Sequence, residues 1–201
     1  MYRAGHQPLS ASHASTDRLR LTVEAIDAYN QRDPAGREYP HAVDVTAWVN
    51  RLTGAPSEAL QIAARAHHIG RWEIPRDEFP RNRDGYLEWR RTLARHHAET
   101  TAGILDRCGY DTSFIERVSA IIRKEDIKGD ADTQTFEDAL CLVFMERQLA
   151  DFRTQVDEKK LARILRRTWN KMSAAGHEEA LRLPLSPDTR RFLERTLAAP
   201  D

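Results

Sequence analysis

The stretch SEALQIAARAHHIG, residues 57–70, shows most clearly how this chain folds. Ser57 is a good helix N-cap, because its hydroxyl can accept a hydrogen bond from a free amide of the first turn. Gly70 is typical of the position just after a helix. If these residues are helical, the face that turns towards the core carries Leu60, Ala64, His67 and His68. We therefore expect a helix over residues 58–69 that carries a histidine pair in its last turn.

Apolar spacing of the helical kind recurs along the rest of the chain, and strand-like alternation does not. A helix is expected over residues 38–52, because its apolar positions and one histidine fall on the same face: His41, Val45, Trp48 and Leu52. Further helices are expected over residues 17–30, 86–107, 114–124, 136–152, 158–174 and 189–197. The sequence thus predicts an all-α protein. We expect residues 1–15 to form a flexible N-terminal arm and residues 16–201 a single compact helical domain.

The overall charge excludes several classes of partner. The 201 residues include 31 basic and 31 acidic ones, so no field of one sign would draw the chain to nucleic acid or an anionic membrane. The longest apolar run, residues 139–145, is too short to cross a bilayer. Cys108 and Cys141 are too few for a disulfide scaffold. We expect a cytoplasmic protein whose partner is a small anionic molecule held by a local cluster.

Histidines and carboxylates recur beside the apolar stripes of several predicted helices. They are His41, the pairs His67-His68 and His96-His97, and Glu137-Asp138. Metal sites in helical proteins are built from such residues on facing helices, and this set suits Zn, Mn, Fe, Ni or Co. A histidine on an apolar face is also common as a core residue. Asp138 completes a capping box with Thr135, which explains it without a metal.

A cationic and aromatic segment separates the two histidine pairs. Its members include Arg71, Trp72, Arg76, Tyr86 and Arg90. Arginine can bind phosphate through two parallel hydrogen bonds, and aromatic rings can stack on a planar group. We expect Arg71 and Arg76 to contact the anion, and Trp72, Tyr86 and Arg90 to contribute to substrate binding. The alternative is a solvated loop whose tryptophans fill the core.

The order of these motifs resembles the HD-domain superfamily, which consists of all-α metal-dependent phosphohydrolases. The segment AHHIG, residues 66–70, is similar to the LHDIG pattern of that superfamily. The resemblance implies an HD-like helical bundle with metal ligands at His41, His67, His68 and Asp138. His68 stands where the superfamily has aspartate. Histidine bridges two metal ions poorly, which argues against a dinuclear centre.

A longer resemblance covers nearly the whole chain. The segments that carry it are residues 63–99, residues 137–147 (EDALCLVFMER) and residues 168–186. They resemble the family called domain of unknown function 4202, which brings no established activity. In that family Gln is frequent at the position of His67, Phe at that of His96 and Tyr at that of His41. This resemblance therefore favours His68, His97, Glu137 and Asp138 as the site.

Three functional hypotheses follow. The first is a metal-dependent hydrolase of HD-like type acting on a small phosphorylated molecule, such as a nucleotide, with Glu137 or Asp138 positioning the water and Arg71 and Arg76 neutralising charge. The second is a non-enzymatic helical module that binds an anionic ligand through its arginine-rich loop. The third is an HD-like iron oxygenase, which the richness in histidine favours.

Overall fold

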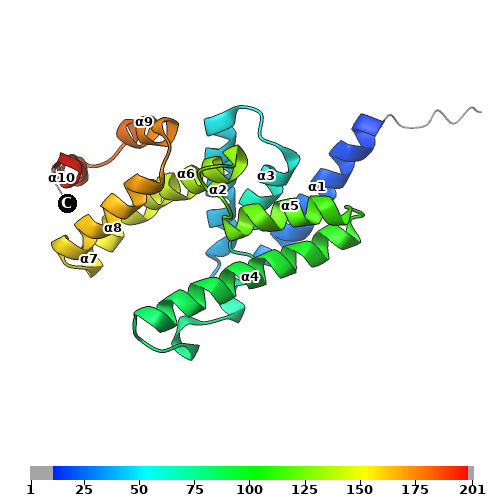
Figure 1. Ribbon diagram of the computed structural model, residues 1–201, viewed down its shortest axis with the longest axis horizontal. Coiled ribbons are helices and arrows are strands. Elements are labelled where there is room, and N and C mark those ends of the chain that lie inside the picture. The colour runs from blue at the N-terminus through cyan, green and yellow to red at the C-terminus, as the bar shows by residue number, and fades with distance from the viewer. Residues whose placement is uncertain (1–10, 199–201) are drawn as a thin grey trace, which may run out of the picture.

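The computed structural model describes the backbone of residues 11–198 and, within it, side chains from Thr16 onward. The longer helices of the first part are α1 (Ala11–Asn30), α2 (Glu38–Thr53), α3 (Glu58–Arg65), α4 (Arg83–Arg107) and α5 (Thr112–Arg123). The second part contains α6 (Ala131–Val143), α7 (Leu149–Gln155), α8 (Glu158–Lys171), α9 (Ala174–Arg182) and α10 (Pro187–Ala198). Over residues 11–198 there is no strand, which confirms the all-α prediction (Figure 1).

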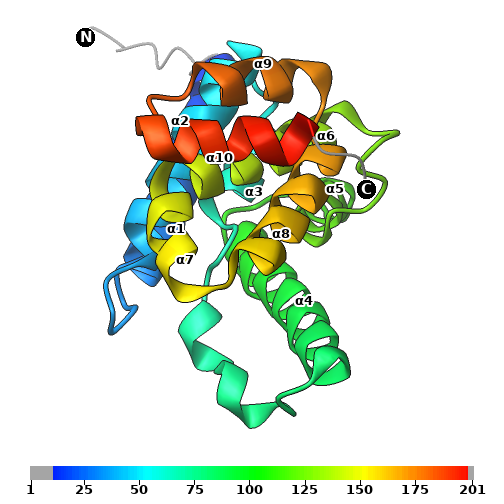
Figure 2. The same ribbon diagram turned by 90° about the vertical axis from the view of Figure 1, so that its left-hand side faces the viewer.

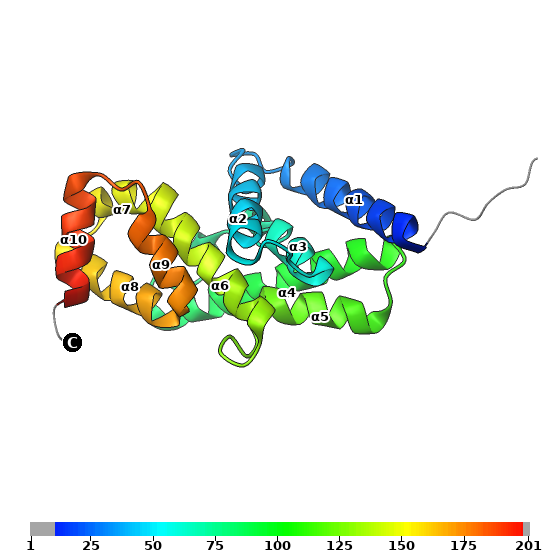
Figure 3. The ribbon, with the colours of Figure 1, turned by 90° about the horizontal axis from the view of Figure 1, so that it is seen from above.

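The helices form two groups that share α6. Seen from above, α1, α3 and α5 lie towards one end of the molecule and α7–α10 towards the other, with α2 and α6 between them (Figure 3). The helix α6 packs against α2, α3 and α5 on one side and against α8 and α9 on the other. Its side chains Phe136, Ala139 and Leu142 are fully buried. Helix α6 is therefore the central helix of the described part of the chain.

A π-helical segment, η3 (Phe144–Gln148), joins α6 to α7 in one continuous rod. The amide of Leu149 donates to the carbonyl of Phe144, five residues back, instead of four. One residue is thereby inserted into the helix, as is frequent at functional sites. The segment's last residue, Gln148, faces a cavity described below.

The segment between α3 and α4 contains only two short 3-10 turns, η1 (Arg71–Glu73) and η2 (Arg76–Glu78). Figure 2 shows this segment running out alongside α4. Trp89 of α4 fastens the segment, because its indole N–H donates to the carbonyl of Ile74. None of the predicted helices covers residues 70–85, and in the structure these residues form only the two short turns before α4 begins.

Several predicted boundaries differ from the structure. Helix α1 begins at Ala11, inside the predicted arm, of which residues 1–10 lie outside the described residues. Helix α3 ends at Arg65, four residues before the expected position. Helix α6 begins at Ala131, because the Asp130 side chain caps it by accepting from the amide of Thr133. Glu137 and Asp138 consequently lie beyond its first turn, and the predicted capping box is wrong.

Helix α9 was not predicted. Ser173 caps its N-terminus by accepting a hydrogen bond from the amide of Gly176. Gly176 allows α9 to approach α6 closely, because a Cβ there would lie 2.8 Å from the Asp138 carboxylate.

Across the described residues, none of the helices combines the length and hydropathy that crossing a membrane requires.

Candidate functional site

Three histidines from two parts of the fold converge. His41 comes from the first turn of α2, and His67 and His68 come from the turn that follows α3. One ligand nitrogen from each lies within 4.8 Å of the others. The His68 ring stacks on both neighbours, with its centroid 4.5 Å from that of His41 and 4.0 Å from that of His67. The structure thus unites three of the five residues expected to bind metal.

Contacts between α1, α2 and α3 hold this arrangement. Arg65, the last residue of α3, forms two hydrogen bonds to the carboxylate of Asp27 in α1. The side chain of Asn30 donates to the Arg65 carbonyl at 3.2 Å. The Asp33 carboxylate accepts hydrogen bonds from the amides of Arg37 and Glu38, which fixes the start of α2. Both chain segments that carry the histidines are therefore anchored by charged or capping contacts.

The histidine nitrogens suit a metal ion. Nε2 of His41 and Nδ1 of His67 are buried and have no hydrogen-bond partner among the residues that the structure describes. Such unpaired buried groups cost stability, and so they call for a ligand. Burial lowers the pKa of His41 to about 4 and places those of His67 and His68 well below the usual value. The rings are therefore neutral, which is the form that binds metal.

The distances between the histidine nitrogens can be compared with those in a zinc site. Two nitrogens bound at about 2.1 Å to a tetrahedral zinc ion lie about 3.4 Å apart. The ligand nitrogens of His41, His67 and His68 all lie within 4.8 Å of one another, a range that includes this separation.

Glu38 orients His68, and sequence reasoning missed it. Nδ1 of His68 lies 3.0 Å from Oε2 of Glu38, so Nδ1–H donates to the carboxylate and Nε2 keeps a lone pair. Glu38 is 7% exposed, and burial raises its pKa to about 7. A signal was present, because Glu38 and His41 lie three residues apart on one face of α2. An acidic residue in a first helical turn is so common that it concealed this role.

The second histidine pair lies beside the cluster, not in it. His97 is buried, and its Nδ1–H donates to the carbonyl of Ile69 at 2.6 Å, which leaves Nε2 free. Its ring centroid lies 5.8 Å from that of His68. His96 contacts Glu73 instead, with Nε2 3.0 Å from Oε2. His97 therefore remains close enough to act on a ligand of the cluster, whereas His96 is engaged elsewhere.

Glu137 and Asp138 do not join the histidines. The Glu137 carboxylate lies between two ammonium groups, 2.7 Å from Nζ of Lys124 and 3.2 Å from Nζ of Lys171. Asp138 accepts hydrogen bonds from the side chain of Gln134 and the amide of Ser173, so it fastens α9 to α6. The structure assigns neither carboxylate to the metal cluster. Their position beyond the first turn of α6 turns them towards these other partners.

Two cavities meet at His68 and Arg71. The first, here called the cationic cavity, has a volume of about 320 Å³. Its polar lining consists of His67, His68, Arg71, Arg90, Arg91, His97, Arg123 and Lys124. The second, here called the aromatic cavity, measures about 630 Å³. Its lining includes Arg37, Glu38, His41, His68, Arg71, Trp72, Arg76, Trp89 and Gln148. Both volumes are in the range of small-molecule sites.

A comparison with protein families finds a match that covers most of the chain. Residues 20–193 match the family model described as "Domain of unknown function (DUF4202)". The chain belongs to the DUF4202 family. Neither the curated proteins nor the solved structures contain a match. The DUF4202 resemblance seen in the sequence is therefore confirmed, and the HD-like arrangement of the bundle stays a prediction.

The predicted anion-binding residues of this DUF4202 protein occupy different positions. Arg71 lines both cavities, and its guanidinium lies 4.9 Å from the Trp89 ring centroid. Arg76 lines the aromatic cavity, but it donates to two backbone carbonyls of its own loop, at 2.9 and 2.8 Å. Trp72 lines the same cavity, whereas Tyr86 lines neither.

Arg90 lines the cationic cavity. Arg71, Trp72 and Arg90 thus lie where a substrate could reach them. Arg76 mainly holds the loop.

Proposed function

We propose that this protein is a metal-dependent hydrolase that acts on a small phosphorylated molecule. The observation that carries the proposal is the cluster of His41, His67 and His68, with unpartnered buried nitrogens, at the junction of two cavities. One of these cavities is rich in arginine and lysine, which match phosphate oxygens. The DUF4202 match adds no activity of its own, so the proposal depends on the site.

The side chains divide the work as follows. A divalent ion bound by the three histidines would supply an acidified water and polarise the phosphoryl oxygen. Glu38 holds the His68 ring with Nε2 free for ligation. Arg71 lies at the junction of the two cavities, where its guanidinium can neutralise charge on the phosphoryl group. Trp72 offers an aromatic surface for a planar part of the substrate.

Metal analysis of the purified chain tests the proposal first. We expect one equivalent of Zn, Mn, Fe, Ni or Co, and its loss in His67→Ala and in His41→Ala. His177→Ala is the matched control, because His177 stacks on Trp169 outside the cluster. A screen with nucleotides, sugar phosphates and p-nitrophenyl phosphate should then show activity that chelation removes. Absence of both metal binding and activity after supplementation with each metal would refute the proposal.

The cationic cavity supports a second candidate, a module that binds an anion without catalysis, because its arginines and lysine need no metal. In that case a chelator would leave stability unchanged, and Arg71→Ala would abolish anion binding. Iron content with oxygen-dependent turnover would instead favour the HD-like oxygenase.

A further inference from the structure

An ion cluster centred on the buried Glu137 lies beside the cationic cavity and reaches it through Lys124. Glu137 is 2% exposed, and its two carboxylate oxygens contact the ammonium groups of Lys124 and Lys171. Glu137 thus pairs with the largely buried ammonium of Lys124 and with the ammonium of Lys171, which is about half exposed. The buried Lys124–Glu137 pair is balanced, so the positive excess comes from the other cations of the cavity lining, and these favour an anion there.

Lys124 and Lys171 differ in their access to the cavity. Lys124 ends α5 in a left-handed conformation with φ of 59°, and its amide bonds back to the carbonyls of Ala120 and Ile121. This turn places the Lys124 side chain both against Glu137 and in the lining of the cationic cavity. Lys171, which approaches from α8, is absent from that lining in the part of the chain that the structure describes.

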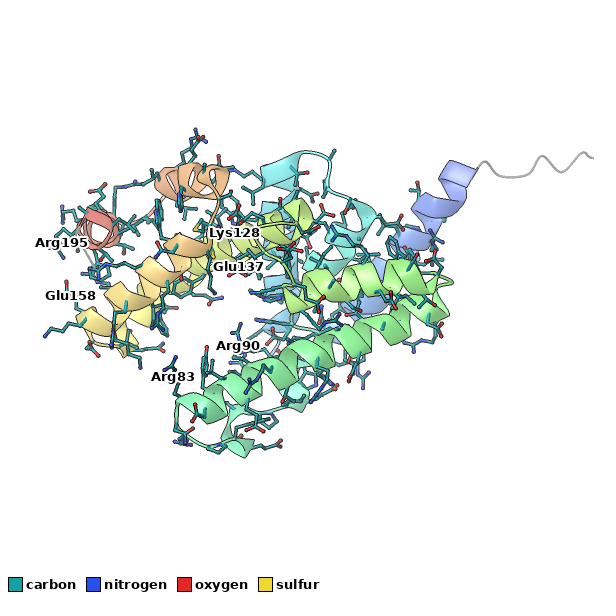
Figure 4. All side chains as sticks on the ribbon, viewed as in Figure 1. Arg83, Arg90, Lys128, Glu137, Glu158 and Arg195 are labelled. Carbon is teal, nitrogen blue, oxygen red and sulfur yellow. The ribbon has the colours of Figure 1, made fainter. Side chains whose placement is uncertain are left out.

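Arginines of α4 face the same space. Figure 4 shows Arg90 extending from α4 on the side where Glu137 lies across from it. Arg90 is close enough to Lys124 to contribute to lowering its pKa, after the larger effect of burial. Neither Arg90 nor Arg91 has an ion pair among the described residues. The described lining of this cavity contains no carboxylate.

We propose that Lys124 and Arg90 bind a phosphate group of the substrate and that Glu137 is the residue that positions Lys124. The inference rests on the proposed function only in taking the substrate to be phosphorylated. Without Glu137, the long lysine side chain would be free to turn towards water. With it, the ammonium stays at the cavity wall, where a phosphate can accept hydrogen bonds from Lys124 and Arg90 together. The binding step requires no metal.

Chemical labelling of the unmodified full chain tests this directly. Pyridoxal 5′-phosphate carries both a phosphate and an aldehyde. The aldehyde condenses with a lysine amine to an imine with loss of water, and borohydride then reduces the imine to a stable amine. In buffer with EDTA we expect peptide mapping to find Lys124 labelled and inorganic pyrophosphate to reduce this labelling at least about fivefold. Labelling confined to other lysines, or unaffected by pyrophosphate, would overturn the inference.

A pair of variants separates direct contact from general charge. Lys124→Met and Lys171→Met each remove one ammonium from Glu137, but only Lys124 lines the cavity. By calorimetry with pyrophosphate, we expect Lys124→Met to weaken binding about tenfold or more, as for a lost hydrogen bond to a charged group. Lys171→Met should weaken it less than about threefold. Equal effects would contradict direct contact by Lys124.

The two proposals can fail separately. A chain that binds no metal and hydrolyses nothing, but whose Lys124 is protected by pyrophosphate, would refute the hydrolase and keep the anion site. A metal-dependent phosphatase whose Lys124 is neither labelled nor needed would do the reverse. Lys159→Met, on an exposed residue of α8, controls for the loss of one positive charge.

Discussion

Replacing Glu38 by Gln should weaken metal binding while leaving the fold intact. Oε2 of Glu38 lies 3.0 Å from Nδ1 of His68, and the carboxylate is buried. Above about pH 8 Glu38, whose pKa is about 7, carries its charge, and a hydrogen bond to a charged group contributes about 1.5–3 kcal/mol. Gln keeps the volume and one acceptor oxygen but removes the charge, so part of this contribution remains. We therefore expect the Kd for zinc to rise about tenfold, or about 1.4 kcal/mol.

The assay is a competition between the protein and a chromophoric chelator for zinc, with thermal unfolding of the metal-free chain to verify folding. Glu73→Gln is the matched control. Its Oε2 lies 3.0 Å from Nε2 of His96 without the geometry of a hydrogen bond, so the variant removes an acidic charge beside a histidine outside the cluster. Wild-type affinity in Glu38→Gln, or an equal loss in Glu73→Gln, would show that the Glu38–His68 contact does not support the metal.

Two further predictions concern stability. Gly70→Ala should cost more than Gly54→Ala in thermal unfolding, although both glycines have φ of 69°. A Cβ at Gly70 would lie 2.6 Å from Nε2 of His96, and one at Gly54 meets nothing within 4 Å. The shared left-handed strain is about 1–2 kcal/mol, and equal losses would refute a clash. Asp130→Asn should lower the free energy of unfolding by about 1 kcal/mol at pH 7, because it removes the ion pair with Arg117. Burial alone would raise the pKa of Asp130, but hydrogen bonds from Arg117 outweigh it and lower the pKa to about 2. This contribution is present above the unfolded pKa near 3.8 and is lost as the pH falls towards 2, so urea titrations of the two proteins should converge there.

The helical class and the order of most helices could be predicted, because apolar residues at helical spacing must face a core. Boundaries were less accessible. Helix α6, which Asp130 caps, begins five residues before the expected start, because a polar residue among other polar residues gives no periodic signal. Helix α9 was missed because its first turn, AAGH, looks like a loop. The need for glycine at position 176 becomes clear only in the structure, where the Asp138 carboxylate lies against it.

The site was predicted in composition more than in arrangement. His41, His67 and His68 were all among the expected ligands, and Arg71 and Arg90 do line the cavity beside them. Which polar residues meet depends on long-range packing that a single sequence does not display. Lys124, at the end of α5, belongs to no motif, yet the turn after that helix brings it to the same cavity.

The early end of α3 explains why both members of the first pair share one site. In a continuous helix with 3.6 residues per turn, adjacent residues point about 100° apart, so only one of His67 and His68 could face the cluster fully. Because the helix ends at Arg65, the two rings instead lie stacked, 4.0 Å apart. The same break leaves the carbonyl of Ile69 outside the helix, where it accepts the Nδ1–H of His97. The early end of α3 thus brings His67 and His68 into the cluster and fixes the tautomer of His97. A substitution that extended α3 through residue 69 should therefore disrupt all three together.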